Sequence, residues 1–477
     1  MNSRLIDRLM LSPRELAVLI LLFLCSLPAV TARLYSSDEV EYFSYLRSLW
    51  FDHDVSFENE YQYFYDHQIA QSGDFHQTFL ELTTPAGRRI NYGTIGSAML
   101  WAPFYAAGDV VARVAHETGR DVAIDGYSRP YVAAVAYGSA FYGFATIVLG
   151  IGAARRLVGA SAVGSGLAVW AGTPVLFYMY IAPPFSHACS AFAVALFVTT
   201  WLQVRDRWTA GGAALLGLTG ALVAMVREQD ALFTLAPALD YALTIGASAA
   251  TGLRLPARLR RALAPAIAGC AAFAIGYVPQ LLAYQALNGR PRPSELVTRK
   301  MNWTAPHALQ VLASPEHGFF FWTPLAVIGI AGLVVLAVRG DAPRRRVGCC
   351  LLLMIALQVY VSGAVESWTV AGAFGQRRFV SITMILVVGL AAMRGAVSRR
   401  ASRIALHAAI AFSVWWNVAL MAEFGTQLMD RHRLELRRNA YDAFVTLPVM
   451  APDLVYRYLA HRSSFYKPQP AAHQDPR

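Results

Sequence analysis

Long apolar runs alternate with shorter polar segments along most of the chain. An α-helix needs roughly 20 mostly apolar residues to cross the hydrocarbon core of a bilayer. Runs near this length occur at 15–34, 131–152, 161–181, 186–203, 210–226, 231–250, 262–286, 318–338, 347–365, 379–397 and 404–424. The pattern predicts an all-α polytopic membrane protein, a bundle of eleven transmembrane helices.

Composition and charge agree with a membrane chain. Of the 477 residues, 56% are hydrophobic and 15% are charged, whereas soluble domains carry about a quarter charged residues. The net charge of +11 is spread over short basic clusters between the apolar runs, so no nucleic-acid partner is indicated. The five cysteines lie in or beside apolar runs and form neither a disulfide framework nor a zinc motif.

The basic clusters predict the topology, because arginine-rich loops stay on the cytoplasmic side. Such clusters fall between alternate spans, at 155–156, 205–207, 254–261, 339–346 and 399–403. The expected organisation is a cytoplasmic N-terminus (1–14), a transmembrane domain (15–424) with a long first outer loop (35–130), and a tail (425–477) on the outer face.

Two segments decide this membrane topology. The stretch 94–114 must lie along the outer interface as a surface helix, since a crossing there would invert the inside–outside alternation. The first apolar run follows Arg4, Arg8 and Arg14 and also fits a cleaved signal peptide. With so many spans after it, we favour a retained signal anchor.

The first outer loop begins with an acidic segment, which has ten acidic residues and one basic residue between positions 38 and 81. Within 38–50, apolar residues fall on one helical face and Asp38, Glu41, Tyr45 and Ser48 line another. This spacing predicts an amphipathic helix along the outer interface. A carboxylate at the membrane boundary is costly to desolvate and marks a functional site, so Asp38 and Glu39 are candidate catalytic groups.

A second acidic group follows in the segment "DHDVSFENE". Asp52, Asp54, Glu58 and Glu60 offer the oxygen ligands that a divalent cation takes. The segment lacks the glycine-containing spacing of a calcium loop, and a solvated loop explains the same residues. A divalent cation is therefore the one cofactor that the sequence leaves open.

Three arginines at the outer ends of spans break the positive-inside pattern. Arg227 stands in "AMVREQDALF", and Arg377 and Arg378 stand in "GAFGQRRF". A guanidinium matches the oxygens of a lipid-linked phosphate, which makes them candidate phosphate ligands. The alternatives are an ion pair of Arg227 with a neighbouring carboxylate, and an interfacial snorkelling pair for the other two.

Two further turns carry polar residues that are candidates for positioning a substrate. His187 follows a Pro-Pro break in "APPFSHACSAF", and Glu316 and His317 stand in "SPEHGFFFWTP". A structural, hydrogen-bonded histidine explains His187 equally well. Interface anchoring explains the aromatic residues of the second turn.

These motifs together resemble the C-type (GT-C) polytopic glycosyltransferases. The resemblance rests on "SSDE" after the first span, "FDHDVSFENE", "MVREQDAL", "SPEHGFFFWTPL" and "SWTVAGAFGQRRF", in their order and sidedness. It covers roughly residues 15–425 and is nearest to the bacterial protein O-mannosyltransferase and aminoarabinose-transferase branch. It implies a GT-C-like bundle with amphipathic helices in the first outer loop.

The resemblance also implies an activity, namely sugar transfer from a polyprenyl-phosphate donor to an acceptor hydroxyl at the outer face of a bacterial plasma membrane. Asp38 occupies the position of the family's base, with Glu39 beside it. The family's basic-Pro-Pro motif has no match, and Arg88 and Arg89 of "RRINYGTIG" stand in its place. Membrane lipids and a lipid-linked sugar are the expected partners, and the acceptor is a protein, a lipid or a glycan.

A transporter or flippase of lipid-linked sugars is the main alternative function. Transporters place ionisable groups and broken helices near the bilayer midplane. In this chain the outer carboxylates and arginines gather at one interface, which favours transfer.

Overall fold

The computed structural model of the chain describes residues 11–69, 75–159, 162–248, 255–461 and 465. Across these ranges the β-type pairs are two isolated bridges, Thr83–Arg89 and Met301–Val365. Three predicted regions lie partly outside the described residues. They are the cytoplasmic N-terminus (most of 1–14), the inner loop that begins at 254, and the end of the tail (most of 462–477).

The chain folds into helices that follow the apolar runs. The first outer loop contains α3 (Ser37–Arg47), α4 (Glu58–Asp66) and α5 (Gly96–Glu117). The bundle contains α2 (Pro13–Ser26), α6 (Arg129–Val158), α7 (Ala162–Gly172), α8 (Val175–Tyr180), α9 (His187–Val204), α10 (Ala210–Val226), η4 (Glu228–Thr234), α11 (Leu235–Ser248), α12 (Leu255–Asn288), α15 (Phe319–Trp322), α16 (Leu325–Arg339), α17 (Ala342–Ala364), η6 (Arg377–Ile382), α18 (Thr383–Ala396) and α19 (Arg400–Thr426). Shorter connecting and tail helices are α13 (Glu295–Arg299), α14 (Ala308–Ala313), α20 (Leu436–Tyr441) and α21 (Leu447–Ala460).

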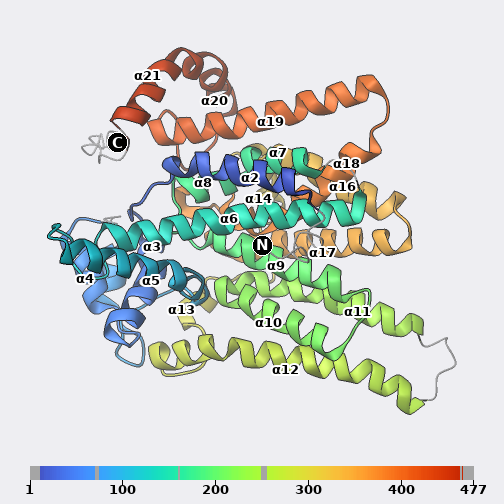
Figure 1. Ribbon diagram of the computed structural model, residues 1–477, viewed down its shortest axis with the longest axis horizontal. Coiled ribbons are helices and arrows are strands. Elements are labelled where there is room, and N and C mark those ends of the chain that lie inside the picture. Colours follow the sequence, from blue (N-terminus) through green and yellow to red (C-terminus); the bar gives the residue numbers. More distant parts are fainter. Residues whose placement is uncertain (1–10, 70–74, 160–161, 249–254, 462–464, 466–477) are drawn as a thin grey trace.

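The long helices run side by side along the long axis of the molecule, with α12 and α19 at opposite edges (Figure 1). Six helical segments in the described ranges are long and apolar enough to cross a membrane, in α6, α9, α12, α17, η6–α18 and α19. The protein is therefore a helical membrane protein. Shorter helices build the other five predicted spans, so the number eleven stays a prediction.

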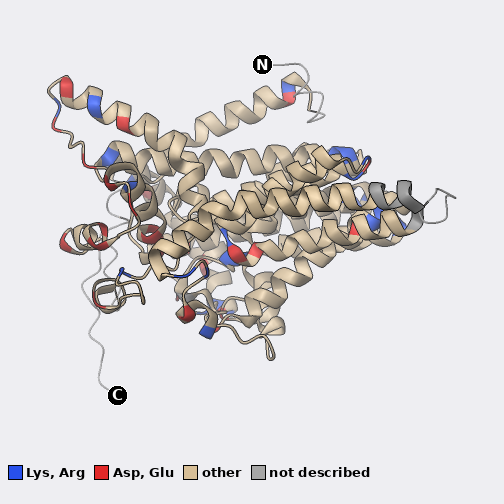
Figure 2. Ribbon diagram, turned by 90° about the horizontal axis from the view of Figure 1, so that it is seen from below, with Lys and Arg blue, Asp and Glu red and all other residues tan. Residues whose placement is uncertain are grey.

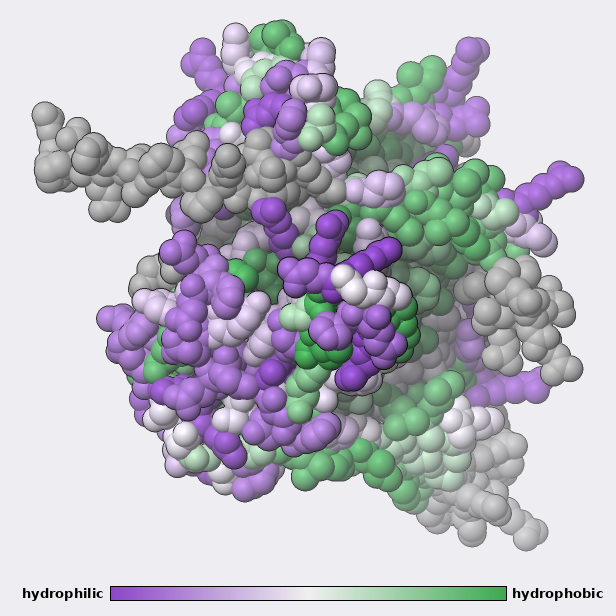
Figure 3. All heavy atoms as spheres, turned by 60° about the vertical axis from the view of Figure 1, so that its left-hand side comes forward, coloured by the Kyte–Doolittle hydropathy of each residue, from purple (hydrophilic) through white to green (hydrophobic). Residues whose placement is uncertain are grey.

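Charge separates along the same axis. In Figure 2 the acidic residues gather mostly at the end that carries α3 and α4, and basic residues gather at the opposite end. Three of the five predicted inner loops meet at that opposite end, where Arg156, Arg205 and Arg344 line one small hollow. Figure 3 shows the acidic end covered by hydrophilic residues and hydrophobic surface behind it, as expected for a membrane protein.

Close backbone contacts hold the apolar helices together. A Cβ on Gly332 of α16 would lie 1.8 Å from the carbonyl oxygen of Gly389 on α18, and a Cβ on Gly389 would lie 2.1 Å from that of Gly329. Only glycine fits at such contacts. Small residues at helix interfaces are typical of membrane bundles, where packing replaces the hydrophobic drive for association.

The first outer loop folds into a compact cap with an aromatic core. Phe43, Phe64 and Tyr105 pack edge to face, and Phe57 and Tyr61 are fully buried beside them. Such aromatic pairs add stabilisation beyond the area they bury. The described part of the first outer loop is therefore a packed cap at one end of the bundle.

The helix at 38–50 differs from the predicted amphipathic surface helix. Its apolar face is buried as expected at Val40, Phe43 and Leu46, but Glu41 and Tyr45 on the polar face are buried as well. The physical reason is the rest of the cap, which packs over the face that sequence periodicity assigns to water.

The stretch 94–114 forms α5, which is not among the six membrane-length helices. It packs antiparallel to the first half of α6. Trp101 donates to Ser139 at 2.8 Å, and Tyr131 donates to Asp109 at 2.7 Å. Its depth in the bilayer stays a prediction.

The tail after α19 returns to the end of the bundle that carries the cap. The Tyr458 hydroxyl donates to the Ala29 carbonyl at 3.0 Å, and the backbone N–H of Leu434 donates to the Pro315 carbonyl at 2.7 Å. Figure 1 shows α21 at the same end of the molecule as α3. The described part of the tail and the first outer loop therefore lie at the same end of the bundle.

Candidate functional site

The start of α3 separates its two adjacent carboxylates. Ser36 caps the helix, and its hydroxyl accepts the N–H of Glu39 at 3.4 Å. Glu39 returns the bond and accepts the N–H groups of Ser36 and Tyr35 at 3.0 and 2.9 Å. This reciprocal capping box turns the Glu39 side chain toward the helix N-terminus. Asp38 is left free to point elsewhere.

Asp38 faces Arg377. The Nη1 atom of Arg377 donates to Oδ2 of Asp38 at 2.5 Å, across 339 positions of sequence. The Arg377 guanidinium also lies over the ring of Phe185, 5.6 Å from its centroid. The side chain of Asp38 is 38% exposed whereas that of Arg377 is 16% exposed, so the carboxylate is the accessible member of the pair.

Arg377 begins η6 after a tight turn. Gly375 has φ +61°, and a Cβ at this residue would lie 2.8 Å from a side-chain carbon of Pro174. Glycine allows both the left-handed backbone and the close approach. Arg378 points away from Asp38 and donates to the carbonyl and the hydroxyl of Ser367 at 2.9 and 3.1 Å.

Arg227 reaches the same place from α10. It follows the last residue of that helix in an extended conformation, and its Nη1 donates to the Ser186 hydroxyl at 3.2 Å and to Nδ1 of His187 at 3.1 Å. The neighbouring carboxylates bind elsewhere, because Tyr284 donates to Glu228 at 2.6 Å and Ser190 to Asp230 at 2.5 Å. The alternative of a local ion pair for Arg227 is therefore wrong.

His187 is held as a neutral ring. Because Nδ1 accepts from Arg227, the ring proton belongs on Nε2. That atom is buried without a hydrogen-bond partner, as are Nε of Arg227 and Oδ1 of Asp230. Buried polar atoms without partners are rare in proteins. Three such atoms therefore lie on Arg227 and on residues near it.

Glu41 lies at this site but was not among the candidate residues predicted from the sequence. It follows Asp38 by three positions on the same helix face, accepts the N–H of Tyr92 at 2.7 Å, and is 5% exposed. Desolvation raises the pKa of its carboxyl, and the negative charge of Asp38 adds to this, while Lys300 and Arg377 act in the opposite direction. The signal was present in the sequence as the shared face of Asp38 and Glu41.

Arg88 and Arg89 lie apart from the pair formed by Asp38 and Arg377. Arg88 is exposed, and Arg89 donates to Glu58 at 2.6 Å in the cap. Their role as donor-phosphate ligands in place of the missing motif stays a prediction, and the geometry places them in the structure of the outer loop.

The four acidic residues considered for a metal are divided among separate partners. Arg47 contacts Asp52 and donates to Glu60 at 3.0 Å, Ser48 donates to Asp54 at 2.8 Å, and Glu58 binds Arg89. No group of three or more His, Cys, Asp or Glu side chains placed to hold a metal occurs in the described part of the chain. These carboxylates do not form a ligand set and instead join the helices and loops of the cap.

His317 packs against the tail, and Glu316 contributes its backbone carbonyl to a hydrogen bond within its own turn. His317 Nε2 lies 2.9 Å from the Arg431 carbonyl, and its ring stacks on Trp322 at 4.9 Å. Burial lowers the pKa of His317 to about 4, so the ring is neutral. Trp322 donates to the backbone carbonyl of Glu316 at 3.0 Å.

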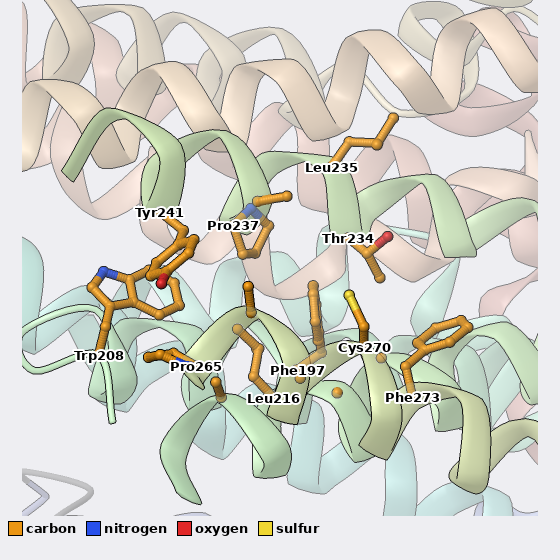
Figure 4. Close-up of a pocket in the computed structure, with 16 residues that line it drawn as sticks. Phe197, Trp208, Leu216, Thr234, Leu235, Pro237, Tyr241, Pro265, Cys270 and Phe273 are labelled. Atoms are coloured by element: carbon orange, nitrogen blue, oxygen red, sulfur yellow. The ribbon is translucent and has the colours of Figure 1, made fainter. Parts of the chain in front are cut away.

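An apolar cavity of about 390 Å³ lies between α9, α10, α11 and α12. Phe197, Leu216 and Phe273 line it, with Thr234 at the end of η4 and Trp208 near the start of α10 (Figure 4). Gly220, another lining residue, precedes Arg227 by seven positions, which is about 10 Å along a helix. An apolar space therefore lies within the bundle on the same helix that ends at Arg227.

No protein-family model and no curated protein sequence has a significant match to this chain.

Proposed function

We propose that this protein transfers a sugar from a polyprenyl-phosphate donor to an acceptor hydroxyl at the outer face of the membrane. One observation carries the proposal, namely the contact of Asp38 with Arg377, beside Arg227 and His187. A base and two phosphate-binding cations thus meet at the polar end of an apolar bundle. The resemblance of the motifs to GT-C enzymes supports the same reading.

The pair of Asp38 and Arg377 explains how donor binding would prepare the base. A phosphate matches the donor fork of a guanidinium better than a single carboxylate oxygen does. The donor phosphate binds Arg377 and Arg227, and Asp38 loses its cationic partner. The Asp38 carboxylate is then free to face the acceptor hydroxyl.

Transfer then follows as a single displacement. Asp38 accepts the proton of the acceptor hydroxyl, and the oxygen of that hydroxyl attacks the anomeric carbon of the donor sugar. The bond between that carbon and the phosphate oxygen breaks, and polyprenyl phosphate leaves with the electron pair. Arg377 and Arg227 stabilise the negative charge on the leaving phosphate. The apolar cavity beside α10 receives part of the isoprenoid chain.

The experiment is a transfer assay with purified protein in detergent and a panel of polyprenyl-phosphate sugars. Wild-type protein is expected to release polyprenyl phosphate and form a glycoside. Because a general base contributes about 10²- to 10⁴-fold, Asp38→Asn should lower the rate by that factor and leave donor binding in place. The matched control is Asp66→Asn, an exposed aspartate of the cap.

Two results would contradict the proposal. Wild-type rates in Asp38→Asn would remove Asp38 from the mechanism. Movement of the lipid-linked sugar across vesicles without glycoside formation would show a flippase instead.

A further inference from the structure

Another pocket, of about 230 Å³, lies between the first outer loop and the segment that follows α12. Arg290, Arg292 and Arg299 line it, together with Glu295 and Asn288. The Thr84 hydroxyl donates to the Leu287 carbonyl at 2.5 Å and ties the two walls together. The pocket therefore has a defined shape.

The pocket carries an excess of positive charge. Nη2 atoms of Arg290, Arg292 and Arg299 lie 3.0, 3.5 and 3.7 Å from the Glu295 carboxylate. Three guanidinium groups thus share one carboxylate, which leaves a charge of +2 among these four side chains. Guanidinium forks without a full set of acceptors are suited to a phosphate or a carboxylate.

The backbone holds these arginines in place. Pro291 and Pro293 flank Arg292, and proline fixes its own φ near −65°. The N–H of Arg292 donates to the Arg290 carbonyl at 2.8 Å, so the segment turns on itself. The backbone at Arg290 and Arg292 is therefore restricted.

Asn288 adds an independent signal. It is 5% exposed, its Nδ2 donates to the Arg292 carbonyl at 3.0 Å, and its Oδ1 is buried without a hydrogen-bond partner. A carbonyl-type oxygen accepts hydrogen bonds and repels an anion, so its natural partner is a hydroxyl. The pocket thus combines donors for an anion with an acceptor for a hydroxyl.

The pocket is connected to the candidate active site through α13. That helix ends at Arg299, and the next residue, Lys300, lies over the ring of Tyr92 at 4.9 Å. Tyr92 is the residue whose N–H binds Glu41, and Lys300 acts electrostatically on the same carboxylate. A helix of five residues is about 7.5 Å long, so α13 places Lys300 within that distance of the arginine-lined pocket.

We propose that the pocket formed by Asn288, Arg290, Arg292 and Arg299 binds an acidic saccharide, a sugar that carries a phosphate or a carboxylate, as the acceptor of the transfer reaction. Its role as acceptor rests on the proposed function, whereas its binding does not. The anionic group binds the arginines, a ring hydroxyl donates to Asn288, and the reacting hydroxyl extends past Lys300 toward Asp38.

Binding is tested by calorimetry on the full-length protein in detergent micelles, with glucose 6-phosphate, glucuronic acid, glucose and inorganic phosphate as probes. The two acidic sugars are expected to bind, and glucose to bind at least tenfold more weakly, since one hydrogen bond to a charged group is worth about 1.5–3 kcal/mol. Inorganic phosphate should bind more weakly than glucose 6-phosphate because it offers no ring hydroxyl. Equal binding of glucose and the acidic sugars, or of phosphate and glucose 6-phosphate, would overturn the proposal.

Variants locate the binding. Arg290→Ala combined with Arg292→Ala should lower the affinity for glucose 6-phosphate at least tenfold. Asn288→Asp should lower that affinity by a similar factor, because it adds a negative charge. The control is Arg113→Ala, an exposed arginine of α5 that also pairs with one aspartate. Arg290 and Arg292 are half exposed, so the double variant should fold, which thermal unfolding checks. Wild-type affinity in the double variant would refute the site.

Asp38→Asn separates this proposal from the proposed function, because it should bind glucose 6-phosphate with unchanged affinity and transfer sugar about 10²- to 10⁴-fold more slowly. Wild-type protein that binds acidic sugars but glycosylates none would contradict the proposed function and leave the site intact. Wild-type protein that glycosylates neutral and acidic sugars equally would contradict the role as acceptor site.

Discussion

Two aspartate–arginine pairs lie at opposite ends of the bundle and differ in how completely they are satisfied. At the end with the basic loops, the side chain of Asp240 is 1% exposed and accepts from Arg205 at 3.0 and 3.2 Å and from Trp201 at 3.0 Å, with Arg346 at 3.5 Å. At the other end, Asp38 has one arginine and an accessible carboxylate, and polar atoms nearby have no partner.

The difference teaches which pair is structural. A buried charge that is fully paired joins the elements that supply its partners, here α9, α11 and α17, and offers nothing to a ligand. A pair with one exposed member and unpartnered neighbours is free to exchange partners. The Asp38 end is therefore the end at which binding and chemistry are expected.

The largest expected effect on stability comes from the satisfied pair. Asp240→Asn leaves Arg205 and the partly exposed Arg346 without their buried carboxylate, and breaking a buried pair costs about 3–5 kcal/mol. Asp38→Asn removes a partly exposed pair, which is worth about 0–1 kcal/mol. Thermal unfolding in detergent checks both, and an equal loss in the two variants would break the comparison.

Arginine-to-lysine exchanges sharpen the comparison through ligand binding. Arg377→Lys keeps the charge and loses the planar fork, so the affinity for polyprenyl-phosphate sugar should fall about 10- to 100-fold. Arg205→Lys should lower the unfolding temperature and leave that affinity unchanged. Binding measured by calorimetry decides, and an unchanged affinity in Arg377→Lys would exclude this arginine as a phosphate ligand.

A further expected effect concerns the pH dependence of stability at Glu39. Burial raises the pKa of this carboxyl to about 8 despite its hydrogen bonds to backbone N–H groups, from 4.5 in an unfolded chain. The folded state then holds more protons than the unfolded state between pH 4.5 and 8, so stability falls as the pH rises through this range and levels off above it.

Glu39→Gln removes this titration and keeps the capping box, because glutamine serves at the same position. Unfolding temperatures between pH 5 and pH 8 should therefore fall by about 2–4 °C less in this variant than in wild type. Glu117→Gln, at an exposed position of α5, is the control. An identical slope in Glu39→Gln and wild type would contradict the buried-carboxyl interpretation.

Much of the bundle could be predicted from the sequence, because a membrane helix is marked by its own apolar length. The predicted runs that became short helices show the limit. The span at 161–181 divides into α7 and α8 around Pro174, and the span at 318–338 divides into α15 and α16 at Pro324. Proline lacks the N–H that a continuous helix needs.

The candidate site was predictable in part. Asp38, Arg227 and Arg377 were expected together because alternating spans bring their loops to one end. Glu39 as a capping residue was also readable, since Ser36 and Glu39 stand in the spacing of a capping box. The roles of the acidic segment at 52–60 were not, because they depend on how the chain turns back, so that Arg47 of the preceding helix meets Asp52 and Glu60 and the more distant Arg89 meets Glu58.

The sequence by itself determined the class of protein and the sharing of charge between two ends, because apolar length and basic clusters are local properties. Only the tertiary structure decided which carboxylate faces Arg377, which polar atoms lack partners, and that α3 is covered on both faces. These depend on contacts between residues hundreds of positions apart, such as Asp38 and Arg377. Periodicity along one helix carries no information about what packs over it.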